Sequence, residues 1–199
     1  MNHYFAPGDG DWRTREITVS LAGRELVVET ASGMFSPEHV DTGTRVLLDT
    51  VPALPDSGIL LDIGCGWGAI ALSMALEAPG ATVWAVDVTD RTLALTGRNA
   101  ERAGVTNIRV AHPDNVPADI RFHTIWSNPP IRVGKAELHA ILETWIPRLE
   151  VGGEAWLVVA KQLGADSLQR WIAERWPTAH VERVTTDKGF RVLRCVWAG

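Results

Sequence analysis

Four consecutive residues, Ser127-Asn128-Pro129-Pro130, follow an apolar run at 122–126 and have the types and spacing to hold an amine. The apolar run reads as a strand, which the prolines must end because proline lacks the N–H that a strand ladder needs. Each proline also restricts the residue before it to extended geometry, so we expect a stiff backbone that aims the Asn128 side chain. The Asn128 amide oxygen and the Pro129 carbonyl are then two acceptors that suit the N–H groups of one planar amine. The motif predicts a site for a base or amide nitrogen.

A glycine loop earlier in the chain is a second candidate site. The apolar run 59–63 leads into Gly64-Cys65-Gly66-Trp67-Gly68 and then into a helical pattern. Glycines let a backbone approach a ligand closely, and a helix N-terminus favours a carboxylate or phosphate. Asp87 ends the next strand, about 20 residues on, where an acid holds a ribose diol in nucleotide-binding folds. This order of strand, glycine loop, helix and acid predicts a nucleoside-cofactor pocket; the alternative is a tight strand–helix turn without a ligand.

The glycine loop alone does not identify the cofactor. Gly64-x-Gly66-x-x-Ala69 also fits the dinucleotide fingerprint, so an NAD-dependent oxidoreductase is one alternative. Two features favour another cofactor. Asp62, just before the loop, suits a pocket that holds an ammonium group, and the acceptors at Asn128 have no obvious role in hydride transfer. A non-catalytic binding module is a further alternative.

Apolar periodicity places both motifs in an alternating pattern of strands and helices. We expect strands at 59–63, 81–86, 107–111, 121–126, 154–160, 180–184 and 191–196, and helices at 69–78, 91–103, 135–148 and 166–176. Two alternating runs at 16–20 and 25–30 predict a hairpin, and Asp41 is a candidate N-cap for a helix through 44–48. The predicted fold class is α/β: a Rossmann-like, seven-stranded, mostly parallel sheet with helices on both faces, plus a small N-terminal β-hairpin. We expect one domain over 1–199, with an extension at 1–52 and the core at 53–199.

Composition excludes several classes of protein. The net charge of −5 argues against a general nucleic-acid coat protein, although it allows a local basic patch. Two cysteines do not suggest a disulfide scaffold, so a reduced, cytoplasmic chain is expected. The six histidines show no metal-ligand spacing, and no segment is apolar enough for a signal core or a membrane span, so we expect neither metal nor membrane.

The segments LLDIGCGWGAIALSMA (60–75), AVDVTDRTLALTGRNAERAGV (85–105) and IWSNPPIRVGKAELHAIL (125–142) resemble class I S-adenosylmethionine (SAM) methyltransferases. More narrowly, the chain is similar to the "methyltransferase small" group, which contains ribosomal small-subunit RNA guanine-N2 methyltransferases. Shorter pieces at 3–5, 33–48, 161–172 and 187–193 extend the resemblance over nearly the whole chain. Some members carry a second, degenerate domain in front. This chain is too short for one and resembles the standalone branch.

The resemblance implies a SAM site and a role for each matching residue. Asp62, Gly64 and Gly66 would contact the methionine part of SAM, Asp87 would hold the ribose, and Asp114 or Asn115 would lie by the adenine. Cys65, Val88 and Asn128 complete the implied cofactor contacts. Asn128, Pro129 and Pro130 would be the catalytic residues, and they would hold the target amine. Ser36 and Thr44 could line the pocket mouth, although turn and helix-start roles explain them equally well.

The implied activity is SAM-dependent N-methylation of the exocyclic N2 amine of a guanine in 16S ribosomal RNA, with the RNA or the small ribosomal subunit as partner. The implied substrate contacts are Ile131, Arg132, Lys135 and Lys161, of which the three basic residues could hold phosphates. Ile131 departs from the broader pattern, in which an aromatic residue often stacks on the target base. Two rivals use the same motif on another amine: a transfer-RNA adenine, or a glutamine amide in a release factor. The acidic balance mildly favours a protein or an assembled particle over naked RNA.

Overall fold

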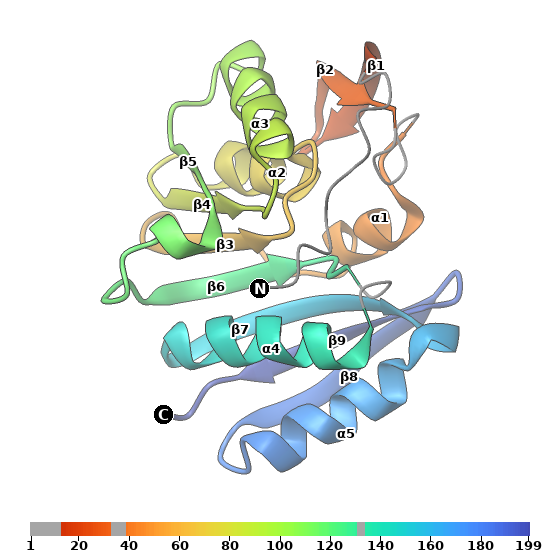
Figure 1. Ribbon diagram of the computed structural model, residues 1–199, viewed down its shortest axis with the longest axis vertical. Helices are drawn as coiled ribbons and strands as arrows, with labels where there is room; N and C mark the ends of the chain where they lie inside the picture. The colour runs from red at the N-terminus through yellow and green to blue at the C-terminus, as the bar shows by residue number, and fades with distance from the viewer. Residues whose placement is uncertain (1–12, 33–38, 131–133) are drawn as a thin grey trace.

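The computed structural model describes residues 13–32, 39–130 and 134–199 of the chain. Within them a seven-stranded sheet has the order β5-β4-β3-β6-β7-β9-β8 (Figure 1). Its strands are β3 (Ile59–Ile63), β4 (Thr82–Val86), β5 (Ile108–Ala111), β6 (Phe122–Ser127), β7 (Leu149–Ala160), β8 (His180–Asp187) and β9 (Phe190–Val196). Strands β5, β4, β3, β6 and β7 run parallel to one another. Strand β9 is antiparallel to both of its neighbours, β7 and β8. The predicted α/β class, with a seven-stranded and mostly parallel sheet, is confirmed.

The order in which strands are added to the sheet reverses in the middle of the chain. From β3 the chain adds β4 and then β5 on one side, and it returns to place β6 on the other side of β3. In open α/β sheets such a switch point is where ligands bind, beyond the carboxyl ends of the strands. The two predicted motifs follow β3 and β6, so both lie at this switch point.

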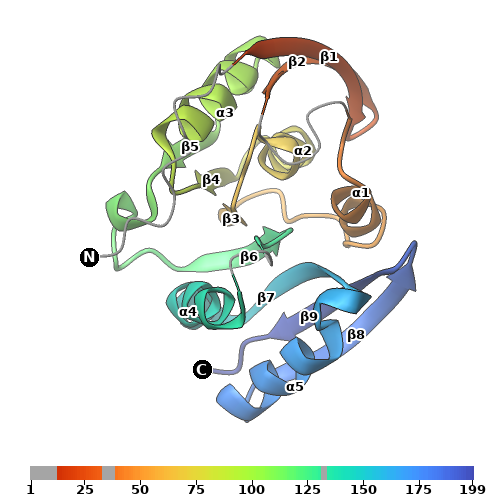
Figure 2. The same cartoon turned by 45° about the vertical axis from the view of Figure 1, so that its right-hand side comes forward.

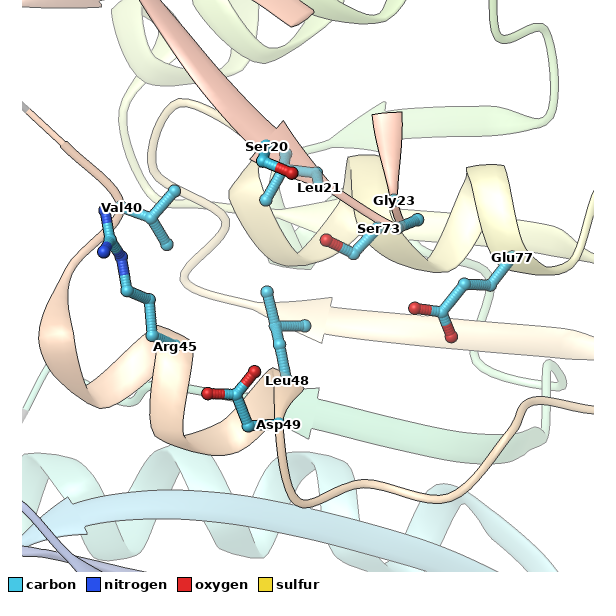
Figure 3. A pocket seen from close by; sticks show the side chains of 10 residues that line it. Ser20, Leu21, Gly23, Val40, Arg45, Leu48, Asp49, Ser73 and Glu77 are labelled. Atoms are coloured by element: carbon cyan, nitrogen blue, oxygen red, sulfur yellow. The ribbon is translucent and has the colours of Figure 1, made fainter. Parts of the chain in front are cut away.

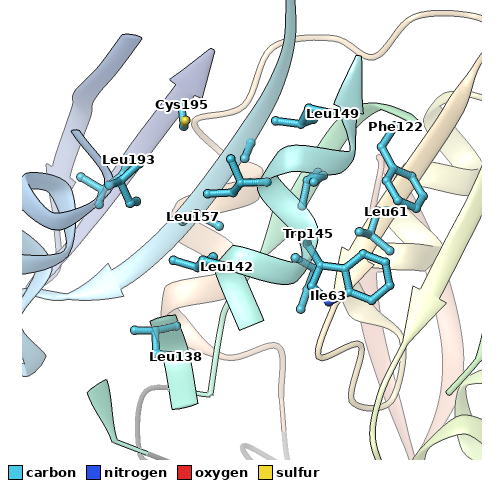
Figure 4. Packing of buried hydrophobic residues seen from close by; sticks show 14 of the residues in the cluster. Leu61, Ile63, Phe122, Leu138, Leu142, Trp145, Leu149, Leu157, Leu193 and Cys195 are labelled. Carbon is cyan, nitrogen blue, oxygen red and sulfur yellow. The ribbon is translucent and has the colours of Figure 1, made fainter. Parts of the chain in front are cut away.

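Helices cover both faces of the sheet, as Figure 2 shows. They are α1 (Thr42–Leu48), α2 (Ala69–Glu77), α3 (Asp90–Arg102), α4 (Lys135–Trp145) and α5 (Ala165–Arg175). Helices α4 and α5 pack on one face, where Leu138, Leu142 and Trp145 of α4 meet Leu61 and Phe122 of the sheet (Figure 4). Apolar side chains of α1 and α2 bury the opposite face. Because the central strands are covered on both sides, their sequences read as continuous apolar runs.

Two boundaries differ from the sequence prediction near Pro147. The helix predicted to reach residue 148 ends at Trp145, and a single 3₁₀ turn, Ile146–Arg148, follows it. Proline lacks the N–H for an α-helical bond, which explains the early end. The next strand begins at Leu149 instead of 154, and a register shift opposite 122–124 accommodates its glycines. A side-chain carbon at Gly153 would lie 2.9 Å from the His123 carbonyl oxygen, so Gly153 permits close packing of the two strands.

The N-terminal hairpin forms a sheet of its own from β1 (Thr14–Leu21) and β2 (Arg24–Ala31). Val19, Leu21 and Val28 pack with Trp67 and Leu95, which belong to the α2 and α3 region. The hairpin therefore covers helices and does not pair with an edge of the seven-stranded sheet.

Buried Asn99 of α3 anchors the hairpin by hydrogen bonds. Its amide donates to the carbonyls of Glu29 and Trp67 at 2.8 Å each, and its oxygen accepts from the Glu29 N–H at 2.7 Å. Ion pairs from Arg98 and Arg102 to Glu29 add to this anchor at the surface. These contacts join β2 to α3 and, through Asn99, to Trp67 in the glycine loop itself. In the parts of the chain that the structure describes, no helix is long and apolar enough to cross a membrane.

Candidate active site

The glycine loop and the segment Asn128-Pro129-Pro130, called the Asn-Pro-Pro step below, are neighbours at the carboxyl edge of the sheet. Ile63 and Ser127, the last residues of β3 and β6, are register partners, and the Ser127 hydroxyl donates a 2.8 Å hydrogen bond to the Ile63 carbonyl. A side-chain carbon at Gly64 would come within 3.7 Å of Cδ of Pro130. Ser127 and Ile63 are 64 residues apart in the chain. The two motifs are therefore distant in sequence and adjacent in space, and together they form one candidate site.

The glycine loop has a backbone shape that glycine adopts without strain and that other residues rarely adopt. Gly64, Gly66 and Gly68 have φ values of 73°, 58° and 100°, which side chains rarely adopt. The N–H groups of Gly64 and Cys65 both donate to the Val86 carbonyl, at 2.9 and 3.0 Å. A carbon added at Gly66 would meet nothing within 4 Å, so the loop is open at this position. The loop can thus admit a ligand against its backbone.

Thr96 of α3 holds the glycine loop through a side-chain hydrogen bond. Its hydroxyl donates to the Gly66 carbonyl at 2.8 Å, and it lies 3.4 Å from the Cys65 sulfur. The Cys65 thiol is buried and faces Thr96, and burial raises its pKa well above the usual value. Any contact of Cys65 with a cofactor would come from its backbone. Periodicity alone did not single out Thr96, which looks like an ordinary buried helix position.

Asp62 is fully buried, and one of its two carboxyl oxygens lacks a hydrogen-bond partner among the described residues. Its Oδ2 accepts a 3.0 Å hydrogen bond from the Ala71 N–H in the first turn of α2. Its Oδ1 is buried and has no hydrogen-bond partner among the described residues. Burial, with the charge of Asp87 adding to it, raises the pKa of Asp62 to about 8. A buried acceptor of this kind is suited to a cationic ligand group, whose binding would favour its ionised form.

The acids predicted for a nucleoside lie along the same edge. Asp87, just beyond β4, accepts 3.3 Å hydrogen bonds from the N–H groups of Gly66 and Thr89, and burial raises its pKa. Val88 beside it is 57% exposed, so its side chain is accessible to a ligand. Asp114 and Asn115 are exposed on a 3₁₀ turn after β5. Because β3, β4 and β5 are parallel, all these positions follow carboxyl ends of adjacent strands.

Asn128 is half-buried and held by helix α1. Its side-chain Nδ2 donates to Oδ2 of Asp41 at 2.8 Å and to the Thr44 hydroxyl at 3.1 Å. Asp41 is also the N-cap of α1, as predicted, because the same Oδ2 accepts from the Thr44 N–H at 3.2 Å. The contact between Asp41 and Asn128 was not predicted. The only sequence signal for it was that Asp41 and Thr44 lie in a segment, 33–48, that takes part in the family resemblance.

The predicted substrate contacts are only partly described. Ile131 and Arg132 lie outside the described residues. Lys135 begins α4, Lys161 follows β7, and both are exposed at the carboxyl edge. A small groove of about 130 Å³ separates the starts of α4 and α5, with Lys135, Leu138, Val159 and Ser167 in its wall.

A larger cavity, about 300 Å³, lies elsewhere (Figure 3). It sits between the hairpin turn and the later turns of α1 and α2, with Leu21, Arg45, Ser73 and Glu77 in its wall. None of the predicted site residues lines it, so the chemistry of the strand edge, and not cavity size, identifies the candidate site. No group of His, Cys, Asp or Glu among the described residues is arranged to hold a metal ion.

Comparison with known proteins gives one consistent family. A family model described as the methyltransferase small domain matches residues 25–194. The Bacillus subtilis (strain 168) protein YbxB, described as uncharacterized, is 36% identical over 177 residues, which cover 87% of each chain. A ribosomal RNA small subunit methyltransferase C of Shewanella amazonensis is 30% identical over 160 residues, which are 78% of this chain but only 46% of that protein.

Solved structures share the fold. The T. thermophilus 16S rRNA N2 methyltransferase RsmC, in complex with AdoMet and guanosine, aligns with a TM-score of 0.79 at 22% identity. The alignment covers 96% of this chain and 52% of that one. A methyltransferase from Pyrococcus furiosus aligns with a TM-score of 0.68 at 24% identity over 87% of this chain. At these identities the likeness establishes the architecture alone.

Proposed function

The chain belongs to the methyltransferase small family of SAM-dependent enzymes, and from this premise we propose that it methylates the exocyclic N2 amine of a guanine in 16S ribosomal RNA. One observation carries the proposal. Asn128 lies beside the glycine loop with its NH₂ end bonded to Asp41 and Thr44, which leaves the amide oxygen as the end that can accept from a substrate amine. Family membership gives no support to the nicotinamide-dependent alternative.

The residues of the glycine loop and its acids fit SAM. When bound, SAM supplies a methyl group activated by a sulfonium centre. Asp62 would hold the ammonium group of the cofactor, because its buried Oδ1 lacks a hydrogen-bond partner in the described chain. Gly64, Cys65 and Gly66 would offer backbone to the methionine part. Asp87 would bind the ribose diol, with Val88 and either Asp114 or Asn115 beside the adenine.

The Asn-Pro-Pro step would activate the amine by accepting hydrogen bonds from it. An exocyclic amine is a poor nucleophile because its lone pair is delocalised into the ring. Acceptance of its two N–H groups by the Asn128 oxygen and the Pro129 carbonyl favours a pyramidal nitrogen with a localised lone pair. The same acceptors stabilise positive charge as it develops on that nitrogen. The rigid Pro129-Pro130 backbone keeps both acceptors in place, and no strong base is required.

Two observations support small-subunit RNA as the substrate. The Shewanella relative and the T. thermophilus structure are named as small-subunit rRNA methyltransferases. Exposed Lys135 and Lys161 stand at the carboxyl edge, where they can hold phosphates beside a base turned out of its stack. The net charge of −5 suits an assembled particle better than naked RNA. The contributions of Ile131 and Arg132 stay predictions.

Radiolabelled SAM offered in parallel to unmethylated small subunits, transfer RNA and release factor tests the proposal. We expect label in the small subunit, and nuclease digestion followed by chromatography should recover it as N2-methylguanosine. Label confined to release factor or to transfer-RNA adenine would replace the guanine assignment with one of the two rivals. The Asn128→Ala variant controls for contaminating activity, since label transferred at this site should nearly vanish with it.

A further inference from the structure

We propose that Asp41 is a positioning residue for methyl transfer: it sets which end of the Asn128 amide faces the substrate. The inference rests on the proposed function and deepens it, because it assigns a role to the α1 segment that the glycine loop and the Asn-Pro-Pro step do not explain. Asp41 lies 87 positions before Asn128 in the chain and comes from a different element of the fold.

The contacts around Asn128 define the orientation of its amide. The side-chain NH₂ has two hydrogens and two acceptors, Oδ2 of Asp41 at 2.8 Å and the Thr44 hydroxyl at 3.1 Å. An ionised carboxylate accepts hydrogen bonds and has none to give, so the amide end that faces Asp41 must be the NH₂ end. The amide oxygen then points away from α1.

If the Asn128 amide could adopt either orientation, it would not reliably present its oxygen to the substrate amine. The two ends of an asparagine amide are nearly the same size, and backbone geometry alone does not choose between them. In the reversed orientation, Asn128 would present donors to a substrate amine that also carries donors. The rigid Pro129-Pro130 step fixes where the amide lies, and Asp41 fixes which way it is turned. The hydroxyl of Thr44 can donate or accept, so it fits either end of the amide and the choice of orientation rests on Asp41.

The start of α1 is itself held firmly against the sheet. Phe190 of β9 packs on Gly43: a side-chain carbon at Gly43 would lie 2.8 Å from Cε1 of Phe190 and 3.0 Å from Oδ2 of Asp41. The absence of a side chain at Gly43 therefore lets Phe190 and the Asp41 carboxylate approach the same turn. Buried Val46 and Leu47 add apolar packing against β7 and β9. This arrangement gives the 187–193 segment, which contains Phe190, a physical role in the site.

The test compares two substitutions that both keep the helix cap. Asp41→Asn retains an acceptor oxygen at the position of Oδ2, whereas Asp41→Ser retains a capping hydroxyl that is too short to reach Asn128. With labelled SAM and small subunits, we expect Asp41→Ser to lower kcat by roughly ten- to a hundred-fold, as misplacement of a reacting group does. Asp41→Asn should keep most of the turnover. SAM affinity, measured by calorimetry, should be unchanged in both variants.

A second measurement does not depend on activity. The side-chain NH₂ signals of Asn128 in ¹H–¹⁵N spectra, identified by their loss in Asn128→Ala, should show slow solvent exchange in the wild type and in Asp41→Asn, and faster exchange in Asp41→Ser. Wild-type kcat in Asp41→Ser, or identical NH₂ exchange in all three proteins, would overturn the inference. If the wild type transfers no label to small subunits, the proposed function fails, and the exchange measurement still decides whether Asp41 orients the amide.

Discussion

The carboxylate of Asp41 accepts a 2.8 Å hydrogen bond from the side-chain amide of Asn128. This bond joins the N-terminus of α1 to the loop after β6, and it turns the amide oxygen of Asn128 away from α1. The short helix α1 is therefore part of the candidate active site as well as cover for the sheet.

Removal of the Asn128 side chain should separate chemistry from cofactor binding. We expect Asn128→Ala to lower kcat by about 10²–10³, the usual loss when one preorganised hydrogen-bonding group is removed from a reacting centre. SAM affinity should change little, because the main candidate cofactor contacts come from the loop after β3 and from the ends of β4 and β5. Single-turnover transfer and calorimetry measure the two quantities. Equal losses in both would contradict a role confined to the amine.

The buried carboxylate of Asp62 should make the ligand-free protein sensitive to pH. Its pKa rises from 3.8 to about 8 on folding, so folding favours the protonated form. The free energy of unfolding should therefore decline as the pH rises from about 4 to about 8, where Asp62 ionises in the folded state. Urea unfolding across this range measures the decline.

The Asp62→Asn variant is the matched comparison. Asparagine has nearly the same shape and cannot ionise, so most of the decline should disappear, and a smaller one should persist because the pKa of Asp87 is also raised. The same variant should lose SAM affinity, since it lacks the charge for the ammonium group. A variant that binds SAM normally would contradict the role of Asp62 in the cofactor site.

The hydroxyl of Thr96 should be needed to keep the glycine loop in shape. Thr96→Val removes the bond to the Gly66 carbonyl, and we expect a loss of about 1 kcal/mol in unfolding free energy together with weaker SAM binding. Thr144→Val is a matched control, because the Thr144 hydroxyl bonds the Ala140 carbonyl on the exposed side of α4. Calorimetry should show unchanged SAM affinity for the control. The same affinity for Thr96→Val would show that the loop holds its shape without this bond.

Asn99 should contribute more to stability than the surface ion pairs beside it. Asn99→Leu leaves the backbone groups of Glu29 and Trp67 without their partners, and a loss of about 2–3 kcal/mol in unfolding free energy is expected. Arg98→Ala removes only an exposed ion pair to Glu29 and should have a much smaller effect. Thermal and urea unfolding compare the two. A larger loss for Arg98→Ala would contradict the view that buried bonds anchor the hairpin.

The lysines at the carboxyl edge should act on substrate binding and not on chemistry. Lys135→Ala and Lys161→Ala should each raise KM for small subunits, leave kcat unchanged and reduce the salt dependence of binding by about one ion per lost phosphate contact. Arg121→Ala is the control, since Arg121 is exposed just before the amino end of β6. An equal rise of KM in Arg121→Ala would indicate a general charge effect instead of local phosphate contacts.

Much of this molecule could be predicted from local patterns. Apolar runs broken by turns and helices dictate an α/β sheet, because a strand buried on both faces must be apolar throughout. The glycines after β3 and the prolines after β6 mark strand ends, and parallel strands bring such ends to one edge. The positions of Asp62, Asp87 and Asn128 in the site follow from that rule. The end of α4 before Pro147 was open to prediction from the same chemistry, because proline cannot continue the helix.

Contacts between distant elements were decided only by the tertiary structure. Asp41 could be identified as a helix cap from its neighbours, but its bond to Asn128 depends on where α1 docks, and the contact of Phe190 with Gly43 helps to determine that. The placement of the hairpin on α2 and α3 likewise depends on Asn99, 70 residues away from Glu29. Periodicity reports which face of an element is buried and not which partner buries it. The sequence by itself therefore determined the fold class and the sheet edge that carries the candidate site, and tertiary packing decided how the amide of Asn128 is turned.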